Sequence, residues 1–223
     1  MQKAAFITGT SRGIGKAIAE LLLIKNYLVF GYSRTNTIEH PNFKFCKINL
    51  SDLKEIKKIS FPKIKSTEVL LINNAARIGK IVPLNQKKSA DIIKDYNLNI
   101  IAPSILCSKF INAFYNNKKL ILNVSSGAAN NNIACWSTYC ASKSALDQLT
   151  NIIAIEQHKK LNVFSVHPGV VNTQLQAKIR NSDPECLDLF LVFPDVSLVF
   201  PGNFKTFPDP ERNLHISYHT AEP

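Results

Sequence analysis

Short apolar runs alternate along this chain with segments whose apolar residues recur at helical spacing. The apolar runs cover residues 3–8, 27–32, 43–48, 68–72, 120–124 and 163–166. The helical patterns cover residues 13–25, 90–114 and 138–158, with a break expected near Pro103. Continuous apolar strands separated by helices are typical of a parallel sheet covered on both faces. The sequence therefore predicts an α/β fold, a single doubly wound Rossmann-type domain with a parallel sheet.

Composition limits the classes of protein open to this chain. Its 223 residues, 45% of them hydrophobic, suit one α/β domain better than two. No apolar run approaches the roughly 18 residues of a membrane span, and the run that ends at Thr8 is short for a signal peptide. Five scattered cysteines form no CxxC pair and no Cys/His cluster. We therefore expect a cytoplasmic protein with reduced thiols, no metal and no membrane partner.

The formal charge of +11 is the one unusual bulk feature. The lysines are dispersed, mostly in pairs, and no basic stripe with interleaved aromatic residues occurs. We expect solvated lysines and no nucleic-acid partner. The charge nevertheless keeps a basic nucleic-acid-binding protein open as an alternative.

A glycine-rich segment follows the first predicted strand, TGTSRGIG at residues 8–15. Glycines between a strand and a helix let the turn close and let backbone N–H groups reach a phosphate at the helix N-terminus. A plain glycine turn is the alternative, because the spacing differs from the usual G-x-G-x-x-G pattern. The residues expected to bind a dinucleotide here are Gly9, Ser11, Arg12, Gly13, Ile14 and Gly15.

Ser33 and Arg34 follow the second predicted strand, where an NAD-binding protein usually has a carboxylate for the ribose 2′-hydroxyl. An arginine can instead pair with a 2′-phosphate, and Arg12 can reach the same group from the first loop. This pattern favours NADP(H) over NAD, although two merely exposed arginines are the alternative.

Small or polar residues also follow the other predicted strands. Asn49 and Leu50 come after the third strand, where an adenine would lie. Asn74, Ala75 and Ala76, in NNAA at residues 73–76, allow a cofactor to approach the backbone. Ligands in open parallel sheets bind at the carboxyl ends of the strands. The sequence therefore predicts one ligand site along this edge.

These segments together resemble the short-chain dehydrogenase/reductase family. The matching pieces are TGTSRGIG, NNAA, Asn99 in NLNIIAP, SS at 125–126, YCASK at 139–143 and HPGVVNT at 167–173. They occur in the family's order and at its usual separations. NVSSGAA at 123–129 and PGVVNTQLQAKIR are most similar to the branch of bacterial benzil reductases and sepiapterin reductases. That branch implies reduction of carbonyls, often vicinal diketones, with NADPH.

The resemblance implies a catalytic set of Ser126, Tyr139, Lys143 and Asn99. Tyr139 would donate the proton, and Lys143, one helical turn on, would lower the tyrosine pKa and hold the nicotinamide ribose. Ser126 would hydrogen-bond the substrate oxygen. Asn99 would support a water that replaces the proton, or would only satisfy a neighbour's backbone. A second Tyr-x3-Lys pair, Tyr115 and Lys119, lacks the serine thirteen residues before it.

The segment after the sixth strand should position the nicotinamide carboxamide through Pro168, Gly169, Val171 and Thr173, as the family does. His167 beside it is expected to be structural, since the tyrosine already supplies the proton. Trp136 would either line the substrate pocket or pack in the core.

Residues 181–223 depart from the family and hold six of the chain's eleven prolines. We expect an NADP-binding and catalytic domain over 1–180 and an atypical Pro-rich tail, with no long helix, over 181–223. The abrupt change suggests a shifted reading frame or a truncated relative. The family implies a homodimer or homotetramer, but the tail lacks the family's last helix and strand. The predicted function is NADPH-dependent reduction of a small carbonyl substrate, the alternative a cofactor-binding, non-catalytic sensor or interaction module.

Overall fold

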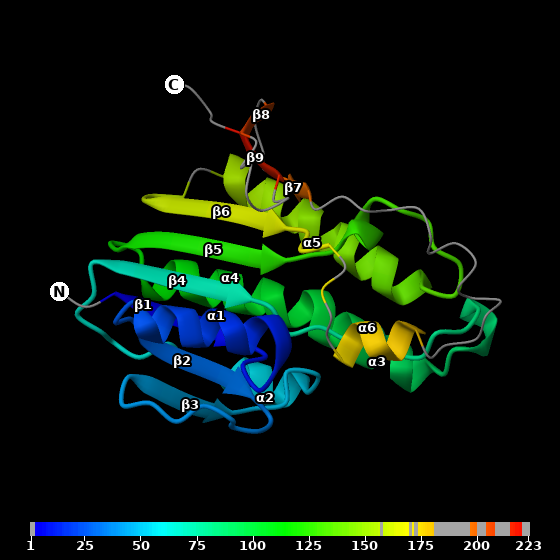
Figure 1. The fold of residues 1–223 in the computed structure, drawn as a ribbon, viewed down its shortest axis with the longest axis horizontal. Coiled ribbons are helices and arrows are strands. Elements are labelled where there is room, and N and C mark those ends of the chain that lie inside the picture. Colours follow the sequence, from blue (N-terminus) through cyan, green and yellow to red (C-terminus); the bar gives the residue numbers. More distant parts are fainter. Residues whose placement is uncertain are drawn as a thin grey trace.

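The computed structural model describes residues 3–156, 158–169, 171, 174–180, 197–199, 204–207 and 215–219. Its sheet has the strand order β3-β2-β1-β4-β5-β6-β7-β9-β8. The first six in this order pair in parallel, and their carboxyl ends lie at one edge of the sheet, as the arrowheads in Figure 1 show. The predicted single Rossmann-type α/β domain is confirmed.

The six parallel strands correspond to the six apolar runs. They are β1 (Ala4–Thr8), β2 (Leu28–Ser33), β3 (Phe43–Lys47), β4 (Glu68–Asn73), β5 (Lys118–Val124) and β6 (Leu161–Val166). Three further strands were not predicted: β7 (Ser197–Val199), β8 (Phe204–Phe207) and β9 (His215–His219). β7 pairs antiparallel with β6 and extends the sheet. The other tail residues lie outside the described residues, and the proposed boundary at residue 180 stays a prediction.

The helices are α1 (Gly13–Ile24), α2 (Leu53–Lys58), α3 (Ser89–Tyr96), α4 (Ala102–Ala113), α5 (Ser137–Ile155) and α6 (Gln174–Arg180). Short 3-10 turns lie at η1 (Leu84–Gln86) and η3 (Gly127–Ala129). Between α3 and α4 the chain forms a π-helical turn, η2 (Asn97–Ile101). There the Ala102 N–H reaches back five residues to the Asn97 carbonyl. Because Pro103 has no N–H to donate, the irregularity falls in the turn before it, and the helical path continues past the expected break.

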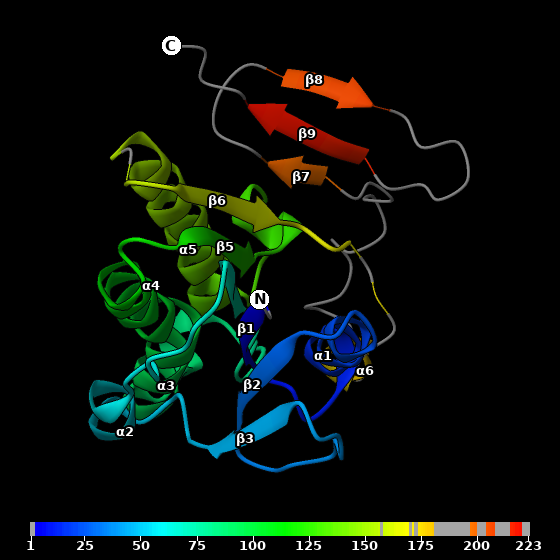
Figure 2. The ribbon, with the colours of Figure 1, turned by 90° about the vertical axis from the view of Figure 1, so that its left-hand side faces the viewer.

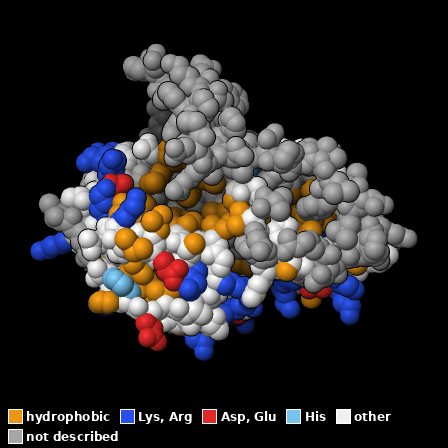
Figure 3. Space-filling model, in the orientation of Figure 1, with side chains coloured by type: hydrophobic (Ala, Val, Ile, Leu, Met, Phe, Trp, Pro, Cys, Tyr) orange, Lys and Arg blue, Asp and Glu red, His pale blue; other side chains and the backbone are white. Residues whose placement is uncertain are grey.

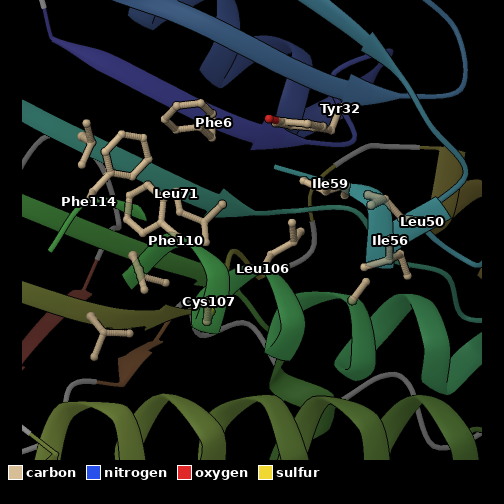
Figure 4. Packing of buried hydrophobic residues seen from close by; sticks show 14 of the residues in the cluster. Phe6, Tyr32, Leu50, Ile56, Ile59, Leu71, Leu106, Cys107, Phe110 and Phe114 are labelled. Carbon is tan, nitrogen blue, oxygen red and sulfur yellow. The ribbon is translucent and has the colours of Figure 1, made fainter. Parts of the chain in front are cut away.

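The sheet lies between two layers of helices. Figure 2 shows α2, α3, α4 and α5 on one face and α1 with α6 on the other. On the first face, Phe6 of β1 packs against Phe110 of α4 and against Phe114, with ring centroids 6.0 and 5.4 Å apart (Figure 4). On the second face, Ala19 and Leu23 of α1 pack on β1 and β2. Burial on both faces explains why these strands are continuously apolar.

On the face seen in Figure 3, Lys and Arg side chains are scattered around the rim and form no continuous stripe. Within the part of the chain that the structure describes, no helix has the length and apolar character needed to cross a membrane. Cys46, Cys107 and Cys140 carry free thiols. Cys135 is disulfide-bonded, so the expectation of reduced thiols is wrong there, because spacing along a chain does not reveal which sulfur atoms meet.

A buried charge network joins α3 to the start of α5. The Asp95 carboxylate has no exposed surface and pairs with Arg77 Nε at 2.8 Å and with Lys87 Nζ at 3.5 Å. Thr138 Oγ1 donates to the same carboxylate at 2.7 Å. At Gly79 a Cβ atom would come within 2.4 Å of this carboxylate. The network therefore fixes the loop after β4 and the residue before Tyr139 together.

We predict that Asp95→Ala lowers the free energy of unfolding by about 3–5 kcal/mol, because it leaves the buried Lys87 ammonium without its counter-charge. Chemical denaturation monitored by circular dichroism measures the loss. Asp91→Ala is the matched control, since Asp91 pairs with the same arginine at 3.4 Å but is partly exposed. Its cost should stay below about 1 kcal/mol. Equal losses in the two variants would contradict this account.

Candidate active site

The loop after β1 is closed by hydrogen bonds from β4. Asn74 Nδ2 donates to the carbonyls of Thr8 and Gly9 at 2.9 and 3.3 Å. The N–H groups of Asn74 and Ala75 donate to Thr8 Oγ1 at 2.9 and 3.0 Å. Gly9 and Gly13 take the left-handed conformation, with φ of 76° and 57°. These contacts present backbone N–H groups at the start of α1, the arrangement that binds phosphate.

Gly15 lies behind this loop, where no side chain fits. A Cβ atom at that position would come within 2.3 Å of Asn74 Nδ2 and 2.4 Å of the Gly9 carbonyl oxygen. The glycine therefore allows α1 to approach the ends of β1 and β4 closely. Gly15 is not among the residues that line the cleft, and its predicted contact with a cofactor stays a prediction.

A cleft of about 1000 Å³ runs along the carboxyl edge of the sheet. Its lining includes nearly all the residues predicted to bind a cofactor: Gly9, Ser11, Arg12, Gly13, Ile14, Ser33, Arg34, Asn49, Leu50, Asn74, Ala75, Ala76, Pro168, Gly169 and Val171. Thr173 lies outside the described residues. Together with Ser125 and Ser126 after β5, these residues come from the carboxyl ends of all six parallel strands and surround one cavity.

Ser126, Tyr139 and Lys143 meet on the wall of the same cleft. Tyr139 and Lys143 lie one turn apart on α5, and Lys143 Nζ is 5.8 Å from the centre of the tyrosine ring. The Lys143 ammonium donates to the Val124 carbonyl at the end of β5, at 2.7 Å. Ser126 follows this strand, and its hydroxyl bonds Tyr139. Neighbouring Ser125 also lines the cleft, and its hydroxyl donates to the Lys143 carbonyl at 3.5 Å.

The protonation of Tyr139 differs from the expectation. Burial raises the pKa of the Tyr139 phenol to about 12, and the hydrogen bond with Ser126 only partly opposes this rise. This shift runs opposite to the expected lowering, because burial penalises the charged phenolate. Burial also lowers the pKa of Lys143 to about 8, against the opposing charge of Asp147. At neutral pH the tyrosine therefore holds its proton and most of the lysine is charged.

Asn99 lies outside the cleft lining and holds the loop after β4. Its Oδ1 accepts from the Arg77 N–H at 2.9 Å, and its Nδ2 donates to the Arg77 carbonyl at 2.8 Å and to Ser142 Oγ at 3.0 Å. The side chain thus satisfies a neighbour's backbone, as in the structural alternative. The π-helical turn η2 turns this asparagine toward both partners.

Trp136 and Lys119, the lysine of the second Tyr-x3-Lys pair, are buried and make structural contacts. Trp136 is buried, packs edge-to-face on Tyr139 at 5.7 Å, and does not line the described cleft, which favours core packing. Lys119 is buried at the opposite end of β5 from Ser126. Its ammonium, with three N–H groups, lies within hydrogen-bond distance of four backbone carbonyl oxygens, those of Phe114, Tyr115, Asn117 and Lys159.

Several lining residues were not predicted. Arg77 and Ile78 follow Ala76, so extending the strand-end rule by two residues would have found them. Residues 174–177 approach the cleft from α6, for which the sequence pattern offered no separate signal. Among the described residues, no group of three or more His, Cys, Asp or Glu side chains is arranged to hold a metal ion.

Comparison with known proteins places this arrangement in a family. A family profile described as short chain dehydrogenase matches residues 3–184. The chain therefore belongs to the short-chain dehydrogenase family of oxidoreductases. Curated relatives include a "Benzil reductase ((S)-benzoin forming)" of Bacillus subtilis, 36% identical over 79% of this chain and 77% of the relative. The sepiapterin reductase of Rattus norvegicus is 27% identical over 80% and 79%.

Solved structures agree with the fold. A short-chain dehydrogenase/reductase from Burkholderia vietnamiensis superimposes with a TM-score of 0.71 and 32% identity, covering 82% of this chain and 92% of that one. The family and the branch expected from the motifs are confirmed.

We predict that Gly15→Ala destabilises the protein by about 1–3 kcal/mol, because the added methyl group meets a backbone oxygen that cannot move away. Thermal unfolding at fixed concentration measures the change. Gly127→Ala is the matched control, since a Cβ atom there meets nothing within 4 Å. A midpoint for Gly15→Ala equal to that of Gly127→Ala would contradict the proposed packing of α1 on the strand ends.

Proposed function

We propose that this protein is an NADPH-dependent carbonyl reductase that acts on ketones, with vicinal diketones as the first substrate class to test. The observation that carries the proposal is the meeting of Ser126, Tyr139 and Lys143 on the wall of the cleft. The names of the benzil reductase and sepiapterin reductase relatives support the same reaction type.

The cleft suits a dinucleotide on structural grounds. The glycine loop and the start of α1 would hold the pyrophosphate through their backbone N–H groups. Gly9 lets this loop lie close to the end of β4, because a Cβ atom there would come within 3.1 Å of the Ala75 backbone. Exposed Arg12 and Arg34 would hold the 2′-phosphate. Pro168, Gly169 and Val171 would lie beside the nicotinamide, with Thr173 as the proposed further contact. A bound NADPH supplies the hydride for the reduction.

The three side chains would handle the proton and the developing charge. The Tyr139 hydroxyl gives its proton to the carbonyl oxygen of the substrate. The tyrosine still holds this proton at pH 7, because its pKa is raised. Ser126 donates a hydrogen bond to the same oxygen as negative charge develops there. The Lys143 ammonium stabilises the tyrosinate left behind and holds the nicotinamide ribose. Asn99 contributes by fixing Arg77 and Ser142, and its proposed support of a proton-returning water would be additional to these contacts.

We predict that Tyr139→Phe lowers kcat/KM for NADPH-dependent reduction of benzil by about 10²–10⁴, because the proton donor is removed while the ring still packs. Stopped-flow loss of NADPH absorbance measures the rate, and a fluorescence titration measures NADPH binding, which should be kept. Tyr115→Phe is the matched control, since this exposed tyrosine belongs to the second pair. Tight NADPH binding with no turnover of any carbonyl by the unmodified protein would favour the non-catalytic alternative.

We predict that Arg34→Ala weakens NADPH binding by tenfold or more, corresponding to about 1.5–3 kcal/mol for a lost charged hydrogen bond. NADH binding should change little, because NADH has no 2′-phosphate. Titration calorimetry with both nucleotides measures the ratio. Lys44→Ala removes an equal charge from an exposed site outside the cleft and should leave the ratio unchanged. Parallel losses for NADPH and NADH in Arg34→Ala would count against selection of the phosphate.

A further inference from the structure

Asp147 continues the line of Tyr139 and Lys143 along α5. The three residues are spaced by four, so their side chains share one face of the helix. This face looks toward the carboxyl ends of β5 and β6. The polar groups that meet it there are the Val124 carbonyl, Ser125, Ser126, Ser165 and His167.

The Asp147 carboxylate bridges α5 and the end of β6. One carboxylate oxygen accepts from the Ser165 hydroxyl, and the other lies 2.8 Å from His167 Nε2. His167 Nδ1 is buried without a hydrogen-bond partner among the described residues, so the proton of a neutral ring lies on Nε2. The next two residues, Pro168 and Gly169, line the cleft. The carboxylate thus ties the helix of Tyr139 to the loop proposed to hold the nicotinamide.

The same carboxylate is the charged neighbour of Lys143. Burial alone would raise the pKa of Asp147, but the hydrogen bonds from His167 and Ser165 outweigh it and hold that pKa below its usual value. Asp147 is therefore ionised at neutral pH. Burial lowers the Lys143 pKa, and the negative charge of Asp147 opposes this fall. Without that charge the ammonium would lose its proton at a lower pH.

We propose that Asp147 and His167 form a positioning pair for the reaction. Asp147 keeps the Lys143 ammonium charged, and its bond to His167 fixes the start of the loop that carries Pro168 and Gly169. This role in the reaction rests on the proposed carbonyl reduction. The Asp147–His167 pair would also affect cofactor binding, which can be measured without turnover. His167, expected to be only structural, therefore serves the site through Asp147.

The test compares Asp147→Asn with Glu156→Gln in the full chain. Glu156 lies at the C-terminal end of α5 and also pairs with a histidine, His158, at 2.8 Å, but that pair is exposed. The first readout is the pH profile of kcat/KM for benzil reduction with NADPH. In the unmodified protein we expect the alkaline limb to fall as the pH rises through about 8, because burial lowers the Lys143 pKa to that value. Asp147→Asn should move this limb about one pH unit lower, and Glu156→Gln should leave it in place.

Asp147→Glu separates the charge from the hydrogen bond. It should keep the alkaline limb near its original pH, whereas a merely structural aspartate predicts the same limb in all three variants. His167→Phe should weaken NADPH binding about tenfold and leave the limb in place, because Asp147 keeps its charge. Thermal unfolding confirms that each variant is folded. If Asp147→Asn does not fold, the NADPH affinity of His167→Phe decides, and an affinity equal to that of the unmodified protein would overturn the proposal.

The second readout is the pH dependence of the NADPH dissociation constant, which needs no turnover. If the unmodified protein binds NADPH but reduces no carbonyl, the proposed function fails, and the pair is judged by this readout alone. An unchanged limb and unchanged NADPH affinity from pH 6 to 9 in folded Asp147→Asn would overturn the proposal. A shift equal to that of Glu156→Gln would overturn it as well.

Discussion

Side-chain hydrogen bonds that tie the carboxyl ends of neighbouring strands hold the candidate site in shape. Asn74 of the β4 end bonds the backbone of the β1 end at Thr8 and Gly9. Asn73 donates to Asn123 Oδ1 across β4 and β5 at 2.8 Å, and Asn123 donates to Thr150 of α5 at 2.8 Å. These bonds are buried, where losing one partner costs about 1–3 kcal/mol. The phosphate loop and the helix of Tyr139 are therefore parts of one connected structure.

Two carboxylates, the buried Asp95 and the partly buried Asp147, extend this connection to the helices. Asp95 joins α3 to Thr138 of α5, the residue immediately before Tyr139. Asp147 joins α5 to the end of β6. Each carboxylate has more than one hydrogen-bond or ion-pair partner, as buried charges require. α5 is thus held at both sides of the Tyr139–Lys143 pair, which limits how far these side chains can shift relative to the strand ends.

The sheet and most of the cleft could be predicted because they need only strand order. A parallel sheet puts every carboxyl end at one edge, so residues such as Ser33 and Asn49 fall into the cleft once their strands are located. Contacts between side chains of distant segments produce no comparable pattern in the sequence. Nothing in the sequence showed that Asp95 would pair with Arg77 and Lys87, or that Asp147 would meet His167. The depth of burial at Tyr139 was equally hidden, which reversed the expected direction of its pKa shift.

The central place of β1 has a consequence for how the chain folds. Ala4 pairs with Leu28 on one side and with Val69 on the other. The pairing of β1 with β4 closes a loop of more than sixty residues. The entropy lost in closing this loop precedes the stabilising contacts, which makes the step slow. Until residues 69–72 arrive, one apolar edge of β1 stays open to other strands. We therefore expect that intermediates during refolding, more than the finished protein, determine how readily this chain aggregates.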